Sequence, residues 1–200
     1  MNSFTSDFIK GTVYHELCHA SHFTAAGTNW YTDFVNAEPA EIAAHPGAND
    51  QFNPYGNSAT VNSPIIALGE AWGYHLGHFL NDQRYGVSAS CKQEQLGGGQ
   101  FCNTGGTGHP DIDVLENYNP GLQSDPFRWI PKGLMEDLID NGEPFATNVN
   151  DQVLGLNTQQ IFSALQNDVT TLQQYRARLL QQINNNQLTQ INNLFTSYGY

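Results

Sequence analysis

An HExxH pattern occupies the stretch His15-Glu16-Leu17-Cys18-His19, and it decides how the rest of the chain is interpreted. On a helix, residues i and i+4 lie one turn apart on the same face, so both imidazoles can reach a single metal ion. Glu16 lies beside them, where its carboxylate can accept a proton from a water molecule at that metal. The pattern therefore predicts that His15 and His19 are two ligands of a zinc ion.

The residues around this pattern have the periodicity of a helix. Ser6 or Asp7 can cap its start, and Gly27 can end it at the C′ position. Apolar side chains recur between these ends at helix-like intervals: Phe8, Ile9, Val13, Leu17, Ala20 and Phe23. The HExxH pattern thus lies in the middle of a predicted helix, which is the geometry that the two histidines need.

Composition and charge narrow the class of protein. The chain has 200 residues and 39% apolar content, which suits one domain with a substantial core. Its net charge of −12 argues against nucleic acid or an anionic membrane as a partner. No apolar run is long enough for a transmembrane segment, and strand-like alternation is scarce. We therefore expect a mainly α fold with long loops and little or no β-sheet.

A catalytic zinc ion takes three protein ligands and keeps one position open. The metzincin pattern HExxHxxGxxH would need glycine and histidine where this chain has His22 and Ala25, so that pattern is excluded. His22 is instead interpreted as a histidine at the rim of the site or beside a ligand, because three ligands from one straight helix rarely converge on one metal. The remaining ligand is expected to be a glutamate from another segment.

Three glutamates compete for that position. Glu38 and Glu41 share a segment interrupted by Pro39, which restricts Glu38 away from the α region. Glu70 lies in a largely apolar predicted helix that begins at Ser63-Pro64. Burying a carboxylate without a cation is very costly, so Glu70 needs a positive partner. The sequence favours Glu70 and leaves Glu38 and Glu41 as alternatives.

The segment Gly69-Glu70-Ala71-Trp72-Gly73-Tyr74 resembles the glutamate helix of gluzincins, in which a small residue and an aromatic residue follow the ligand. With residues 13–23, it makes the chain similar to bacterial gluzincin-type zinc metallopeptidases. The resemblance implies a zincin-like helical catalytic domain with His15, His19 and Glu70 as zinc ligands and Glu16 as the general base. Thermolysin-like enzymes carry an aspartate four residues after the ligand glutamate, and this chain departs from them with Tyr74.

Hydrolysis of a peptide also needs a hydrogen-bond donor for the oxyanion that develops beside the metal. Four residues are candidates: His78, Tyr74, Tyr55 and His109. His78 shares the helix face of Glu70 because it lies eight positions further on. We therefore expect Glu16, His78 and Tyr74 to take part in catalysis.

The remainder of the chain is assigned to the same domain. Residues 1–156 are expected to form the catalytic part, with a short aromatic helix followed by a loop over 28–62 and a further helix over 133–140. Residues 157–200 are expected to form a helical hairpin packed on it, in which a long helix from Asn157 is broken at Asn184-Asn185-Asn186. Cys91 and Cys102 bracket a glycine-rich loop that a disulfide could close.

These features favour a zinc-dependent hydrolase, and in particular a metallopeptidase acting on a peptide or protein substrate. The alternative is a module that binds zinc without catalysis, or a helical interaction module. An uncharged surface rich in Asn and Gln, together with the expected disulfide, suggests export, although the first residues carry no signal peptide. The HExxH pattern begins only fifteen residues into the chain, which leaves no room for the sheet that usually precedes it in zinc peptidases. We therefore expect a longer protein.

Overall fold

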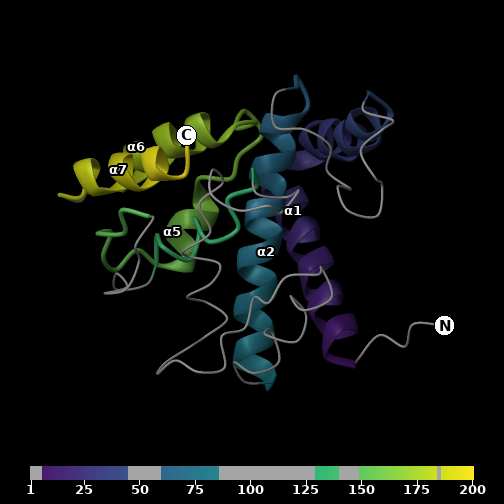
Figure 1. The fold of residues 1–200 in the computed structure, drawn as a ribbon, viewed down its shortest axis with the longest axis horizontal. Coiled ribbons are helices and arrows are strands. Elements are labelled where there is room, and N and C mark those ends of the chain that lie inside the picture. Colours follow the sequence, from purple (N-terminus) through teal and green to yellow (C-terminus); the bar gives the residue numbers. More distant parts are fainter. Residues whose placement is uncertain (1–5, 45–59, 86–128, 140–148, 184–185) are drawn as a thin grey trace.

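The computed structural model describes residues 6–44, 60–85, 129–139, 149–183 and 186–200. Its helices are α1 (Ser6–Ala44), α2 (Ser63–Tyr85), α5 (Thr158–Ser163), α6 (Leu172–Gln182) and α7 (Leu188–Ser197) (Figure 1). No β-strand occurs among these described residues. The expected mainly α fold is therefore confirmed.

Helix α1 changes direction at Gly27, whose backbone has φ 85° and ψ 177°. Glycine adopts a positive φ without the steric penalty that other residues meet there. The first segment, residues 6–26, carries the HExxH pattern, and the second segment, residues 28–44, leaves it at an angle (Figure 1). The predicted helix end at Gly27 thus marks a bend, after which a second helical segment begins at once.

This second segment continues through Pro39 to Ala44, whereas the sequence predicted a short helix followed by a loop. The helix is therefore longer than predicted, the restriction of Glu38 away from the α region is wrong, and residues 45–59 of the predicted loop lie outside the described residues. Proline removes one N–H donor and leaves the carbonyl of Val35, four residues earlier, without its partner in the helix. Val35 and Pro39 are both exposed, so water can hydrate that carbonyl and the helix continues.

The first segment of α1 lies antiparallel to α2 (Figure 1). Three glycines spaced one turn apart on α2 face α1. An added Cβ would lie 2.4 Å from the Phe34 ring at Gly69, 2.7 Å from His15 at Gly73 and 3.2 Å from the His15 backbone at Gly77. The absence of side chains at these positions lets the two helices approach closely, and this closeness brings Glu70 to the HExxH residues.

Hydrogen bonds from Trp72 also join α1 and α2. Its indole Nε1 donates to the carbonyl of Cys18 at 3.1 Å and lies 3.0 Å from the hydroxyl of Ser21. The indole is buried, so its N–H needs such acceptors. These contacts fix how far the two helices are shifted along each other.

Residues 129–139 form successive turns, so the helix predicted over 133–140 is wrong for its described part. The turns are closed by short-range hydrogen bonds, such as Leu134 N to Pro131 O and Glu136 N to Gly133 O. Most of the segment is buried, including the polar side chains of Lys132 and Asp137. An amphipathic helix keeps one face in solvent, but residues 129–139 have almost no exposed face. Successive turns instead allow their polar groups to point toward partners inside the protein.

The long helix predicted from Asn157 is interrupted after α5. Asn157 and Gln160 form a capping box at its start, and Thr171 caps α6 after an irregular stretch over 164–171. Within that stretch, the indole Nε1 of Trp30 donates to the carbonyl of Val169 at 2.8 Å. A continuous helix would use this carbonyl internally. A tertiary contact with α1 therefore replaces local helical bonding.

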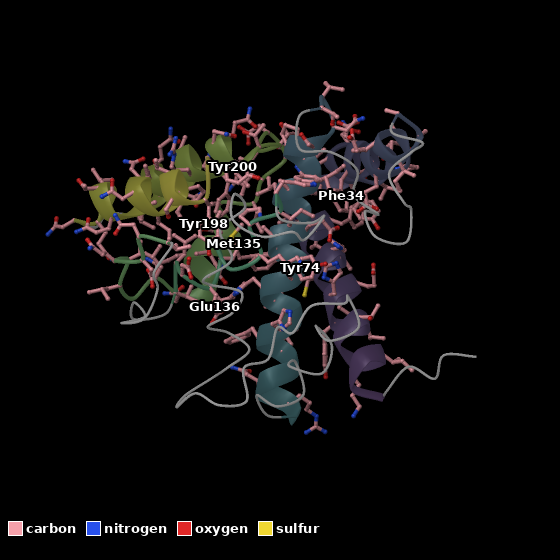
Figure 2. The ribbon with its side chains drawn as sticks, viewed as in Figure 1. Phe34, Tyr74, Met135, Glu136, Tyr198 and Tyr200 are labelled. Atoms are coloured by element: carbon pink, nitrogen blue, oxygen red, sulfur yellow. The ribbon has the colours of Figure 1, made fainter. Side chains whose placement is uncertain are left out.

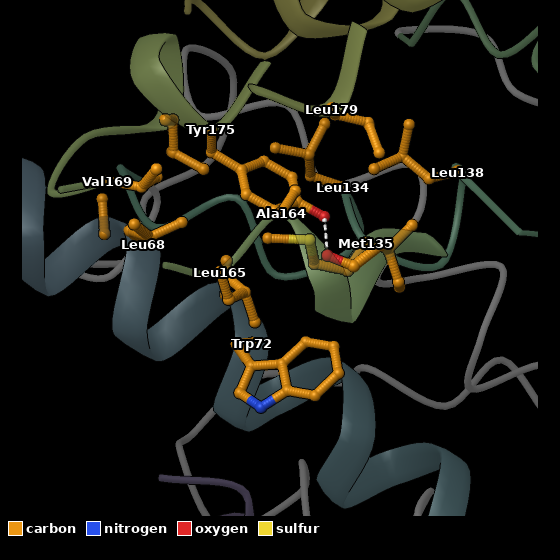
Figure 3. Close-up of a cluster of buried hydrophobic side chains, with 14 of the residues drawn as sticks. Leu68, Trp72, Leu134, Met135, Leu138, Ala164, Leu165, Val169, Tyr175 and Leu179 are labelled. Atoms are coloured by element: carbon orange, nitrogen blue, oxygen red, sulfur yellow. Dashed lines mark hydrogen bonds between the residues drawn. The ribbon is translucent and has the colours of Figure 1, made fainter. Parts of the chain in front are cut away.

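A buried apolar cluster holds the C-terminal helices and the 129–139 turns against α2. Figure 3 shows its labelled members, which are Leu68, Trp72, Leu134, Met135, Leu138, Ala164, Leu165, Val169, Tyr175 and Leu179. Within it, the hydroxyl of Tyr175 donates to the carbonyl of Ile161 at 3.0 Å, which satisfies the buried phenol. In the part of the chain that the structure describes, no helix has both the length and the apolar character needed to cross a bilayer.

Candidate metal centre

Three side chains from two helices direct their ligating atoms toward one point. The Nε2 atoms of His15 and His19, from α1, are 3.0 Å apart. From α2, the Oε2 atom of Glu70 lies 3.3 Å from Nε2 of His15, and its Oε1 atom lies 3.3 Å from Nε2 of His19. All the ligating atoms of the three residues lie within 4.8 Å of one another. The structure thus brings together the three residues that the sequence proposed as metal ligands.

The distances within this group suit side chains that share one metal ion. Zinc, for example, binds imidazole nitrogen and carboxylate oxygen at about 2.0–2.1 Å, which places neighbouring ligand atoms roughly 3.3 Å apart in a tetrahedron. The two imidazole nitrogens are 3.0 Å apart, and each lies 3.3 Å from a different oxygen of Glu70, so the three residues could hold a metal ion. Of two imidazole nitrogens that face each other at such a distance, at most one can donate a proton to the other. A cation would accept lone pairs from both.

Glu70 is buried, with only 2% of its side chain exposed, and its Oε2 atom has no hydrogen bond of good geometry. Burial by itself raises the pKa of this carboxyl, but contacts with His15 and His19 and their positive charge outweigh that effect and hold the pKa below its usual range. A buried carboxylate kept ionised beside two histidines is the environment of a metal ligand.

Gly73 creates the space that the two imidazoles occupy. A Cβ atom at this position would lie 2.7 Å from Cε1 of His15 and 2.9 Å from Cε1 of His19. Real Cβ atoms essentially never approach so closely, so any side chain here would displace the rings. The spacing of Gly69, Gly73 and Gly77 was visible in the sequence, and it is a signal of close helix packing that our sequence analysis did not use.

Glu38, the alternative ligand, also lies at the centre, although Glu70 completes the triangle. Its carboxyl shares a hydrogen bond with Glu70, and burial together with the Glu70 carboxylate raises the pKa of Glu38 to about 7. The sequence argument against Glu38 depended on Pro39 breaking the helix, which it does not do. Glu38 is therefore a neighbour of the third ligand. Glu41, the other alternative, is buried on the same segment and is not among the three converging residues.

Glu16, which lies between His15 and His19 in the sequence, is exposed to solvent. Its carboxylate is close enough to Glu38 and to Cys18 to raise the pKa of each, although burial contributes more in both cases. Its neighbour in sequence, His15, is partly exposed as well. This position is consistent with the predicted general base.

Cys18 is not a fourth ligand. Burial raises the pKa of its thiol to about 12, with a smaller contribution from Glu16. The thiol lies 2.8 Å from the carbonyl of Tyr14, on the side of α1 that faces the core. A thiol that resists ionisation in this way is a poor metal ligand, because metals bind the thiolate.

Tyr74 lies beside the ligand His15, with 5.0 Å between ring centroids and an edge-to-face angle of 74°. The second predicted electrophile, His78, stacks on Tyr74 with centroids 6.4 Å apart. The ammonium of Lys132, from the 129–139 turns, lies 4.6 Å from the centroid of the same tyrosine ring. Figure 2 shows Tyr74 on α2, between the ligand helix and the turns that contain Met135 and Glu136.

Sequence reasoning missed the role of Lys132. It is one of 7 Lys and Arg residues in a chain of net charge −12, and it is buried against the ring of Tyr74. No local pattern places it there, because its position depends on the turns of residues 129–139. The same turns carry Glu136, whose carboxylate lies 2.7 Å from Nδ1 of the buried His75 on α2.

His22 continues the histidine stripe but lies outside the ligand triangle. Its ring packs on Trp30 with 3.8 Å between centroids, and neither ring nitrogen has a hydrogen-bond partner. Burial, with a smaller contribution from His19, lowers the pKa of His22 to about 3. His22 is therefore a neutral core histidine and does not lie at an exposed rim.

Three predictions concern residues outside the described parts of the chain: the electrophile candidates Tyr55 and His109, and the disulfide between Cys91 and Cys102. Comparisons with protein-family models, with curated proteins and with solved structures found no match for this chain. The functional interpretation therefore depends on the geometry of the centre itself.

Proposed function

We propose that this chain is a zinc-dependent hydrolase, and specifically a peptidase that cleaves peptide bonds with an activated water molecule. The observation that carries the proposal is the convergence of His15, His19 and Glu70, two nitrogen ligands and one carboxylate from two helices whose ligating atoms lie within 4.8 Å of one another. Among the described residues, three ligands and not four converge in this way, and Glu16, next to His15 in sequence, is exposed; both features favour a catalytic centre over a closed structural one.

Each residue has a defined part in this chemistry. Bound zinc supplies a Lewis acid that polarises the scissile carbonyl and makes water more acidic. Glu16 accepts the proton of the attacking water and passes it to the leaving amine. The phenol of Tyr74, beside His15, is the favoured donor to the developing oxyanion, with His78 as its alternative.

The accessibility of the site supports a polymeric substrate. Glu16 is exposed and His15 is partly exposed, whereas His19 and Glu70 are buried on the core side. The centre is thus open to solvent along one side of α1. An open site of this kind can accept an extended peptide, which also agrees with the resemblance to gluzincins.

The decisive experiment measures zinc content per chain in protein purified without added metal or chelator. We expect about one zinc per chain in the wild type, as the single ligand triangle implies. Glu70→Ala should lose this metal, because it removes one of three ligands, whereas Glu38→Gln should keep it. A wild-type protein that binds no zinc would overturn the proposal.

Hydrolysis is tested separately with peptide libraries and the zinc-loaded protein. Glu16→Gln should retain zinc and lose cleavage, because the amide cannot accept the proton from water. Zinc binding without cleavage of any peptide would instead indicate the alternative function, a module that binds zinc without catalysis. Full activity in Glu16→Gln would show that another group acts as the base.

A further inference from the structure

The aromatic pair Phe23 and Tyr31 lies at the inner side of the bend in α1. Phe23 belongs to the segment before Gly27 and Tyr31 to the segment after it, and their ring centroids are 5.1 Å apart. Tyr31 in turn lies 6.4 Å from Phe34, whose ring is 5.1 Å from the ligand His19. A continuous path of aromatic contacts therefore joins this pair to the metal centre.

The pair Phe23 and Tyr31 is more exposed to solvent than the neighbouring rings of Trp30 and Phe34. Trp30 and Phe34 are 2% and 5% exposed and belong to the core. Phe23 is 38% exposed, and Tyr31 is only partly buried. A single exposed apolar residue is ordinary on a protein surface, but two adjoining rings, tilted by 58° to each other, offer an angled apolar surface that a bound side chain could cover.

The position of Phe23 relative to Glu16 gives this surface a function. The two residues are seven positions apart, so they share one face of the helix and are separated by about 10 Å along its axis. Helical side chains lean toward the N-terminus, so the ring of Phe23 leans toward Glu16. An extended peptide advances about 3.3 Å per residue, so roughly three residues span this interval.

We propose that Phe23 and Tyr31 form a specificity subsite that binds an apolar side chain of the peptide substrate, two or three residues from the scissile bond. This inference rests on the proposed peptidase function, because it concerns substrate selection at the same centre. The substrates it selects are extended peptides with an aromatic or large aliphatic residue at that distance on one side of the cleaved bond.

The first test is cleavage of a positional-scanning peptide library by the zinc-loaded protein. We expect Phe, Tyr, Leu or Met to be enriched at one position, two or three residues from the cleaved bond. For the best such peptide, Phe23→Ser should lower kcat/KM roughly tenfold through KM, because the buried apolar contact is lost. The same variant should cleave a matched peptide with glycine at that position as well as the wild type does.

Val35→Ser is the matched control, because Val35 is 44% exposed on the second segment and is not part of the aromatic pair. It should leave the kcat/KM of both peptides unchanged. Phe23→Leu should retain most of the preference, because it keeps an apolar surface. A library with no apolar preference at these positions would overturn the inference, as would an equal effect of Phe23→Ser on both peptides.

A binding measurement separates failure of the subsite from failure of the peptidase function. Fluorescence polarisation with the zinc-loaded Glu16→Gln variant should show tighter binding of the apolar peptide than of the glycine peptide. Adding Phe23→Ser should abolish that difference. If the apolar peptide binds more tightly than the glycine peptide but the zinc-loaded wild type cleaves neither, the subsite is supported and the peptidase function is contradicted. If neither peptide binds, the subsite is wrong.

Discussion

Gly73 of α2 is separated by 58 positions from His15 of α1, and a single methyl group at Gly73 would lie 2.7 Å from Cε1 of that imidazole. The ligand geometry of the centre therefore depends on a residue that has no side chain and binds nothing. The same missing atom leaves room for His19, whose Cε1 would be 2.9 Å away. Close helix packing and the convergence of the two imidazoles are thus two consequences of one glycine.

Gly73→Ala should weaken zinc binding roughly tenfold or more, a loss typical when the groups that support ligands are disturbed. Alanine is the better helix former by about 1 kcal/mol, so a loss of affinity would come from the displaced imidazoles and not from a weaker helix. Zinc affinity is measured by competition with a chromogenic chelator. Gly69→Ala is the control, because its Cβ would meet Phe34, so we expect lower stability with zinc binding kept. Unchanged affinity in Gly73→Ala would contradict this account.

His22 should make the stability of the zinc-free protein depend on pH. Burial lowers its pKa to about 3, so between pH 6.5 and 3 the unfolded chain binds a proton that the folded chain does not. The stabilisation is complete above pH 6.5 and is lost as the pH falls toward 3. His22→Phe keeps a ring against Trp30 and removes this titration.

The measurement is the free energy of unfolding in urea, at pH 6.5 and at pH 4.5. The decrease between the two pH values should be about 2 kcal/mol smaller in His22→Phe than in the wild type. The other titrating groups are common to both proteins and cancel in this comparison. Parallel pH dependences for the two proteins would show that His22 is protonated in the folded state.

Lys132 should stabilise the centre through the ring of Tyr74. The desolvated cation–π contact at 4.6 Å contributes on the order of 1–2 kcal/mol, and Lys132→Met removes its charge while keeping a similar length. We expect a lower free energy of unfolding and a several-fold weaker affinity for zinc, because Tyr74 packs on His15. Lys132→Arg should recover most of both, since a guanidinium also binds aromatic faces. A methionine variant as stable as the wild type would exclude this role.

The C-terminal residues should hold the 129–139 turns in place. The hydroxyl of Tyr198 donates to Oδ2 of Asp137 at 2.7 Å, and both side chains are buried. Tyr198→Phe leaves a buried carboxylate without that donor, which costs about 1–3 kcal/mol in urea denaturation. Tyr200→Phe removes a hydrogen bond to the carbonyl of Trp129 and should cost less, because that acceptor is neutral and its residue lies nearer the surface. Equal effects of the two substitutions would argue against a special role for the Asp137 carboxylate.

The sequence by itself determined the helices around His15 and Glu70 and the pairing of His15 with His19, and it favoured Glu70 over Glu38 and Glu41 as the third converging residue. Those inferences depend on local rules, because helical periodicity places positions 15 and 19 on one face, and a single carboxylate in an apolar helix demands a cation. The start of a helix at Ser63-Pro64 and the interruption of one at Gly27 could be predicted for the same reason, since each depends on the backbone preferences of one or two residues.

Only the tertiary structure decided which groups surround the ligands. Glu38 reaches Glu70 because the second segment of α1 bends back at Gly27 and continues through an exposed Pro39. Lys132 reaches Tyr74 because residues 129–139 form buried turns, where local periodicity predicted a helix. Such contacts depend on the angles and distances between elements far apart in the chain. Burial and internal hydrogen bonds of the assembled fold outweigh local propensity there, so no window of sequence contains them.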